Sequence, residues 1–181
     1  QWGLLVAAAV ALSAHFVTFI AAVQMTTVAN ATVFFSVNPV FTATAAFLIF
    51  GERAGWRLVA ATALGIVGIV VIALGDLKLS PDQLPGDAMA VLCSALFTTY
   101  FLLGKRLRPL LDNRVYVTAL YGIAGVLTFP LLLALDLPVV EHDRTTWLAF
   151  LLMALVPTMV GHTSMNLALG YLPAGLISVL V

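Results

Sequence analysis

Two histidines carry the clearest chemistry in this sequence. His15 and His162 lie within apolar segments, where an imidazole can bind a solute, exchange a proton or hydrogen-bond a neighbouring helix. A solute-binding role and a packing role are both open for each of them. A metal or haem site would require the two rings to face each other with further ligands, and His142 stands in a polar connection without clustered donors. We therefore expect no metal ligands and no cofactor.

Neutral hydrogen-bonding side chains recur along the same apolar segments, and a lipid-facing surface would not accept so many of them. The further candidates for the lining of a solute cavity are Gln24, Ser36, Asn38, Tyr100, Tyr121 and Asn166. An uncharged polar cavity with aromatic neighbours favours amphipathic or zwitterionic small molecules over bare ions. No Asp, Glu, Lys or Arg lies deep inside a segment, so the sequence offers no acidic residue for proton coupling.

Pro39 interrupts the second apolar segment directly after Asn38. Proline has no backbone N–H, so the carbonyl near Phe35 is freed from its helical partner. Such a break is tolerated at membrane depth where it lines a cavity or where neighbouring groups satisfy the carbonyl. We expect a kink at Pro39, and a solute site and a plain packing kink remain alternatives for it.

Other polar or small residues are expected to have structural roles. Asn30 precedes the second apolar segment and is expected to cap its helix. The lone cysteine, Cys93, lies in an apolar run and is expected to pack as a small hydrophobic side chain. Ala61, Gly65 and Gly68 are spaced to let two helices approach closely.

The elements that must position these residues are apolar runs. The 181 residues are 62% hydrophobic and 9% charged, with a mean hydropathy of +1.12, far outside the range of soluble proteins. A run of about 20 apolar residues crosses the hydrocarbon core of about 30 Å, and a helix satisfies its own backbone there. We predict six full spans and one incomplete one: Trp2 to Ala29, Ala31 to Phe50, Trp56 to Leu74, Ala88 to Leu103, Val115 to Leu135, Trp147 to Leu169, and Ala174 onward.

Charges in the connections predict the topology. Connections 51–57 and 104–114 together hold six basic residues, whereas connections 76–87 and 136–147 hold only Lys78 and Arg144 among several acids. The positive-inside rule places the first pair in the cytoplasm and the second pair outside. The formal net charge of zero argues against nucleic acid as a partner, because phosphate binding needs clustered basic residues.

Two tight connections indicate internal symmetry. The connection within 22–29 falls outside and the connection within 168–175 falls inside, which is the arrangement of an inverted repeat. We divide the chain into a first half, 1–75, an exterior linker, 76–87, and a second half, 88–181. The chain opens and stops within apolar runs, so both ends are expected to be cut from a longer protein.

Short motifs add a family resemblance. Gln24-Met25-Thr26-Thr27-Val28-Ala29-Asn30, then Val37-Asn38-Pro39-Val40-Phe41 and Phe50-Gly51-Glu52-Arg53, resemble the EamA-type repeat of the drug/metabolite transporter superfamily. Gly161-His162, Asn166-Leu167-Ala168-Leu169 and Tyr171-Leu172-Pro173-Ala174 resemble its second copy. The resemblance implies ten helices in two inverted five-helix repeats, of which this chain would hold helices three to nine. It also implies that Glu52 beside Arg53 fixes a cytoplasmic loop or gates entry.

The function expected from these observations is secondary transport. By resemblance, the protein exports or exchanges a small organic metabolite or drug-like solute across the cytoplasmic membrane by alternating access, and it is not an enzyme. A membrane-embedded redox protein or enzyme with histidine ligands is one alternative, although no paired acids or nucleophile motif support it. A sensor subunit without flux is another. The substrate, the coupling ion and the oligomeric state are not encoded in any motif.

Overall fold

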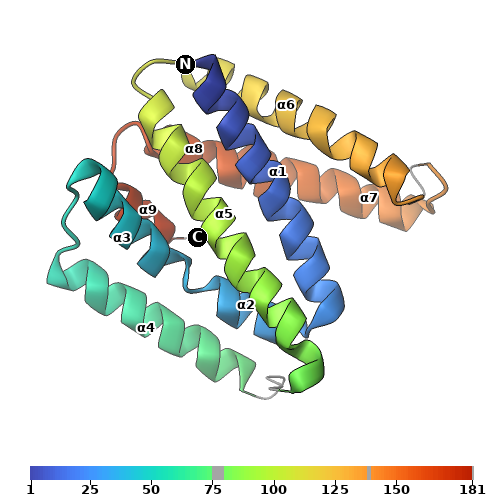
Figure 1. Cartoon of the computed structure of the whole chain (residues 1–181), viewed down its shortest axis with the longest axis horizontal. Helices are drawn as coiled ribbons and strands as arrows, with labels where there is room; N and C mark the ends of the chain where they lie inside the picture. The colour runs from blue at the N-terminus through green and yellow to red at the C-terminus, as the bar shows by residue number, and fades with distance from the viewer. Residues whose placement is uncertain (75–79, 138–139, 181) are drawn as a thin grey trace.

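The chain forms a bundle of membrane-spanning length built from helices (Figure 1). The computed structural model describes residues 1–74, 80–137 and 140–180, without the side chain of Ile72. Every regular element in these residues is a helix. The elements are α1 (Trp2–Met25), α2 (Val28–Phe35), α3 (Asn38–Phe50), α4 (Trp56–Ala73), a 3₁₀ turn (Pro81–Gln83), α5 (Leu84–Leu107), α6 (Asn113–Ala134), α7 (Arg144–Met153), a π-helix (Ala154–His162), α8 (Thr163–Ala168) and α9 (Ala174–Ser178).

The candidate membrane spans coincide with these helices or with runs of consecutive ones. Within the described residues, five helical segments are long and apolar enough to cross a bilayer: Trp2–Met25, Val28–Phe50, Pro81–Leu107, Asn113–Ala134 and Arg144–Ala168. The expected third span corresponds to the apolar helix α4, whose described apolar stretch is shorter. The all-helical membrane class predicted from composition is therefore confirmed.

Three boundaries differ from the expected spans for local reasons. The first helix ends at Met25, because Thr26 adopts an extended backbone before Thr27 caps α2. The second span is two helices, separated at Ser36 and Val37 just before Pro39. The fourth helix begins at Leu84 instead of Ala88, because Pro85 stands in its first turn, where a missing N–H costs nothing.

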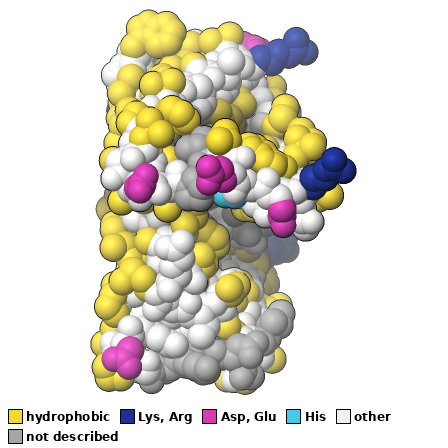
Figure 2. Space-filling view, turned by 90° about the vertical axis from the view of Figure 1, so that its right-hand side faces the viewer, with side chains coloured by type: hydrophobic (Ala, Val, Ile, Leu, Met, Phe, Trp, Pro, Cys, Tyr) yellow, Lys and Arg dark blue, Asp and Glu magenta, His cyan; other side chains and the backbone are white. Residues whose placement is uncertain are grey.

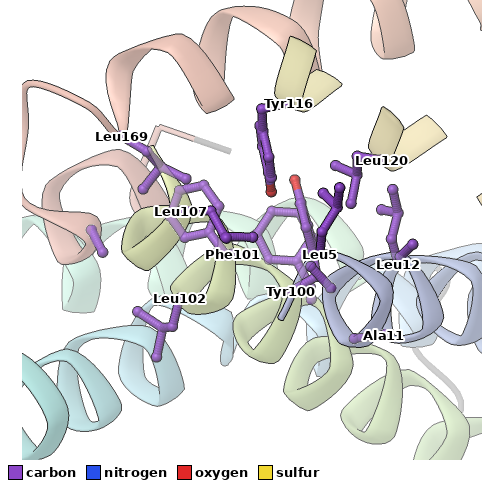
Figure 3. Packing of buried hydrophobic residues seen from close by; sticks show 14 of the residues in the cluster. Leu5, Ala11, Leu12, Tyr100, Phe101, Leu102, Leu107, Tyr116, Leu120 and Leu169 are labelled. Atoms are coloured by element: carbon purple, nitrogen blue, oxygen red, sulfur yellow. The ribbon is translucent and has the colours of Figure 1, made fainter. Parts of the chain in front are cut away.

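The seam between α1 and α5 is the centre of the bundle, and the two helices run side by side in Figure 1. Small residues of α1, including Ala8 and Ala9, are fully buried there against Phe97 and Phe101 of α5. Association of helices within a membrane depends on such close packing, because lipid supplies no hydrophobic drive between them. The same cluster extends to α6, α8 and α9 through side chains shown in Figure 3.

Gly86 marks the closest approach at the end of this seam. A Cβ at Gly86 would lie 2.7 Å from the backbone carbon of Met25 and 2.7 Å from the backbone nitrogen of Thr26. Only glycine lets the first turn of α5 touch the α1–α2 connection at this distance. The expected close packing at Gly65 and Gly68 is wrong for the described residues, since no atom lies within 4 Å of a Cβ built at either position.

The connections gather at two opposite ends of the bundle. The α3–α4, α5–α6 and α8–α9 connections lie at one end, and the α1–α2 and α6–α7 connections lie at the other (Figure 1). The view onto the second end in Figure 2 shows acidic side chains across it and basic side chains at its margin. This grouping matches the two sets of connections separated by their charge in the sequence. Asp76 and Lys78, which were assigned to the second set, lie outside the described residues.

Two expectations about polar residues at this end are wrong. Asp87 was placed in an exterior loop, but it lies in the first turn of α5 and is only 4% exposed. Asn30 does not cap α2, because Thr27 is the capping residue and its hydroxyl accepts from the backbone N–H of Asn30. The Asn30 side chain instead donates to the Asp87 carboxylate at 3.0 Å. The sequence pattern could not show this, because the two residues meet only in the tertiary fold.

Candidate solute-binding site

His15 is a buried, hydrogen-bonded residue of the α1–α5 seam. Its Nδ1 lies 3.1 Å from the carbonyl oxygen of Cys93 and 3.1 Å from the Cys93 sulfur. The Cys93 thiol also lies 3.4 Å from the His15 carbonyl, which it can reach as a weak donor. Cys93 is therefore buried as expected, and in addition it fixes the imidazole of His15. This geometry favours the packing role for His15.

His162 contacts two of the aromatic rings that His15 contacts. Its Nδ1 is 3.3 Å from the hydroxyl of Tyr100, which is fully buried. The Phe97 ring lies 5.2 Å from the His15 ring and 6.1 Å from the His162 ring, centroid to centroid. Phe16 also contacts both histidines, so the two imidazoles share the rings of Phe16 and Phe97 as neighbours. We call His15, Phe16, Phe35, Phe97, Tyr100 and His162 the histidine–aromatic cluster.

A change of helical register delivers His162 to this cluster. Residues Ala154–His162 form a π-helix around Pro157, which cannot donate the backbone hydrogen bond of an ordinary α-turn. The hydroxyl of Thr158 donates to the Met153 carbonyl at 3.2 Å and satisfies a group that Pro157 leaves without a donor. π-Helical turns are common at functional sites because they rotate the side chains that follow them.

Tyrosine and asparagine side chains extend the cluster toward α6 and α8. Tyr116 belongs to the same buried cluster as Tyr100, Tyr121 packs against that cluster, and Asn166 of α8 is fully buried. Figure 3 shows the hydroxyl ends of Tyr100 and Tyr116 pointing into the same region. Several polar atoms here are buried and have no hydrogen-bond partner among the described residues. They are the hydroxyls of Tyr116 and Tyr121 and both side-chain polar atoms of Asn166.

Tyr116 is not among the residues predicted to line the site, because it stands near the start of its span, beside the basic connection. A small residue on α5 makes its position possible. A Cβ at Gly104 would lie 2.5 Å from the Tyr116 hydroxyl oxygen, so glycine leaves the space that the tyrosine fills. No local signal in the sequence pairs these two residues.

Asn38 holds the start of α3 against α5. Its amide donates to the Ser94 carbonyl at 3.2 Å and to the Thr98 hydroxyl at 3.1 Å. Thr42, one turn further along α3, lies 3.1 Å from the same Thr98 hydroxyl. All of these polar groups are buried, and an apolar membrane interior makes their mutual hydrogen bonds hard to replace.

The break between α2 and α3 opens a cavity of about 120 Å³. We call it the helix-break cavity. Its lining includes the predicted residues Ser36, Asn38 and Pro39, together with Thr62 of α4 and Ser178 of α9. Phe35 also lines it, and the Phe35 ring lies 5.8 Å from the ring of His15. Phe35 therefore belongs both to the lining of the cavity and to the histidine–aromatic cluster.

The structure divides the sequence-predicted site residues into three groups. Ser36, Asn38 and Pro39 line the helix-break cavity. His15, Tyr100 and His162 belong to the histidine–aromatic cluster, Tyr121 packs against the buried core that contains Tyr100, and Asn166 is buried on α8, where Met165 packs against the same core. Gln24 is exposed near the end of α1 and joins neither group. No group of three or more metal-ligating side chains forms among the residues described.

Ion pairs and hydrogen bonds tie the bundle together at both ends. At one end the Lys105 ammonium pairs with Glu52, whose second oxygen accepts from the backbone N–H of Ala174 at 3.1 Å. At the other end the Asp87 carboxylate accepts from the Thr26 hydroxyl at 2.7 Å. The first contact joins the connection after α3 to α5 and the start of α9, and the second joins the connection after α1 to the first turn of α5. Glu52 thus bonds across the bundle to α5 and α9.

The comparison with known families identifies the chain. The model of the EamA-like transporter family matches residues 1–74 and 84–181. The chain belongs to this family. The EamA-like chain is also similar to a solved structure described only as "Crystal structure of protein", with a TM-score of 0.84 and 20% identity. The alignment covers 99% of this EamA-like chain and 64% of the other, and identity at this level speaks for the fold alone. No curated protein matches the chain.

Proposed function

We propose that this EamA-like protein is a secondary transporter of a small organic solute, and that it works by alternating access. The observation that carries the proposal is the helix-break cavity, which α2, α3 and α4 share with α9. A discontinuous helix beside a solute-sized space, lined from both parts of the chain, is a recurring arrangement in transporters. The uncharged lining agrees with an organic solute in place of a bare ion.

The contacts at the two ends support a gating scheme. In the proposal, the Glu52–Lys105 pair closes one mouth of the pathway and the Asp87 cluster with Thr26 and Asn30 closes the other. Both contacts join parts of the chain that would have to separate when a mouth opens. Rocking of two inverted repeats, 1–75 and 88–181, would break one set of contacts at a time, with Asp87 moving together with the rest of α5.

Sidedness completes the proposal. The basic connections 51–57 and 104–114 would face the cytoplasm, and 80–87 with 136–147 would face outward, in the cytoplasmic membrane of the cell. We assign export or exchange as the direction by analogy with the family, and no enzymatic activity.

Flux measurements test the proposal. The purified protein would be reconstituted into liposomes and assayed with labelled amphipathic amines, amino acids and nucleosides under solute and pH gradients. We expect saturable flux of at least one class, and a Gly65→Val variant that narrows the helix-break cavity should abolish it. Gly68→Val is the matched control, because it adds the same atoms to the same helix away from the cavity. Absence of flux for every class would remove transport as the function.

A further inference from the structure

We propose that the helix-break cavity and an adjoining apolar groove form one binding site for a primary amine that carries a hydrocarbon or aromatic tail. The inference rests on the proposed transport function for its purpose, but it concerns binding and can be tested without flux.

The polar groups of the lining face the cavity mainly as acceptors. The Ser36 hydroxyl donates to the Val33 carbonyl at 2.6 Å, and the Thr32 hydroxyl donates to the Val28 carbonyl at 2.8 Å. The Ser178 hydroxyl donates to the Gly175 carbonyl at 2.9 Å. Each hydroxyl hydrogen is therefore used within its own helix, and the oxygen keeps its acceptor capacity.

The backbone adds a further acceptor, Asn38 has its amide donors engaged, and Thr62 of α4 contributes a hydroxyl that can accept or donate. Pro39 has no N–H for the carbonyl of Phe35, which stands at the break. The Asn38 amide nitrogen already donates to Ser94 and Thr98, so its donors are engaged on α5. Half-helix carbonyl ends of this type coordinate cations in discontinuous transporter helices.

A primary ammonium matches these acceptors best among simple organic groups. It has three N–H donors and no acceptor, whereas a carboxylate or phosphate has acceptors alone. No acidic or basic side chain belongs to the described lining, so recognition rests on neutral oxygens, as in carbonyl-lined cation sites. A quaternary ammonium carries the same charge without any N–H and serves as the discriminating probe.

The space for the tail is a groove of about 460 Å³ between α3 and α4. It adjoins the helix-break cavity, since Pro39, Thr62 and Ile66 line both. Beyond these residues the groove is walled by apolar side chains such as Phe47 and Leu58. An amphiphile with its head at the helix break would therefore place its tail directly in the groove.

Binding of matched amines tests the head and the tail separately. The probes are propylammonium, hexylammonium and hexyltrimethylammonium, measured by equilibrium binding to the protein in lipid nanodiscs. We expect hexylammonium to bind at least tenfold more tightly than hexyltrimethylammonium. We also expect each added methylene of the tail to tighten binding about fourfold, the value for burying one CH₂ group.

Two variants place the tail. Ala63→Phe fills the groove from α4 and should remove the advantage of hexylammonium over propylammonium, while Ala61→Phe on an exposed part of the same helix should preserve it. Equal binding of the primary and quaternary probes would overturn the amine head. Absence of a chain-length dependence would overturn the groove assignment and would indicate a lipid chain or another protein segment in the groove.

Failure of transport and failure of this inference give different results. If the amines bind with the expected selectivity but no flux is measured, the proposal of transport is contradicted and the proposal of an amine site is supported. If other solutes show saturable flux but no amine binds, the proposal of transport is supported and the proposal of an amine site is contradicted.

Discussion

Glu52 and Lys105 form an ion pair, although they lie 53 positions apart in the sequence. Glu52 follows α3 in a short connection that begins with Gly51, whose backbone lies in the left-handed region. Lys105 stands in the last turn of α5. Lysine near the C-terminal end of a helix also complements the helix dipole. The sequence placed Glu52 beside Arg53, but the fold gives it Lys105 and the start of α9 instead.

The first prediction concerns this pair. Glu52→Gln and Lys105→Gln are each expected to lower the free energy of unfolding by about 1 kcal/mol, because the pair is only partly exposed. The double variant should lose less than the sum, which a double-mutant cycle of thermal unfolding in detergent would measure. Arg53→Gln, at an exposed neighbour, should leave stability unchanged. Additive losses would contradict a direct interaction.

The second prediction concerns the buried carboxylate of Asp87. Asp87→Asn keeps the shape of the side chain but replaces an acceptor of two hydrogen bonds, from Thr26 and Asn30, with a group that is partly a donor. Hydrogen bonds to a charged group contribute roughly 1.5–3 kcal/mol, so we expect about 2 kcal/mol of destabilisation. Asp82→Asn, in the exposed 3₁₀ turn, is the control. An equal effect of the two changes would show that Asp87 has no special role.

The third prediction concerns the close approach at Gly86. Gly86→Ala places a methyl group 2.7 Å from backbone atoms of Met25 and Thr26, which cannot move aside as a flexible side chain would. We expect about 3 kcal/mol of destabilisation, the upper part of the range for overpacking. Gly3→Ala, where nothing lies within 4 Å, should be neutral or slightly stabilising. Thermal unfolding of both variants would decide between a tight and a loose contact.

The fourth prediction concerns pH and the start of α7. The Asp143 side chain accepts from the backbone N–H of Thr146, and this hydrogen bond holds the pKa of the carboxyl below its ordinary value of 3.8. A lowered pKa means that the ionised carboxylate stabilises the fold above pH 3.8 and that this stabilisation disappears as the pH falls through the lower, folded value. The difference in melting temperature between the unaltered protein and Asp143→Ala should therefore shrink in acid.

Asp143→Asn separates charge from capping in this experiment. Asparagine caps helices well but does not titrate in this range, so its advantage over alanine should remain constant with pH. Fluorescence of Trp147, which lies in the first turns of α7, would follow the transition. A pH-independent difference between aspartate and alanine would contradict the role assigned to the carboxylate.

Much of the fold follows from composition and local chemistry. Runs of apolar residues must form helices in lipid, because no other open structure satisfies the backbone there. The position of the break was readable from Pro39, since a missing N–H is a covalent property of the residue. The charge of each connection is likewise a property of its own residues, so the sequence predicted two sets of connections. Figure 1 shows these two sets at opposite ends of the bundle.

The partners of polar residues could not be read in the same way. Asp87 was placed in a loop because a charge next to proline and glycine is typical of a connection, yet Thr26 and Asn30 satisfy it within the bundle. Gly65 was assigned to helix packing from its spacing, but it borders the helix-break cavity. The spacing of small residues defines a smooth helix face without saying what lies against it.

The sequence by itself determined that this protein is a helical membrane bundle with a broken helix at Pro39 and two ends of different charge. These properties depend on side-chain polarity, on backbone donors and on segment length, which are local. The tertiary structure decided that Phe35 contacts both the helix-break cavity and His15, that Tyr100 contacts His162, and that Glu52 pairs with Lys105. Each of these contacts joins residues far apart in the chain, and only the packing of several helices at once brings them within bonding distance.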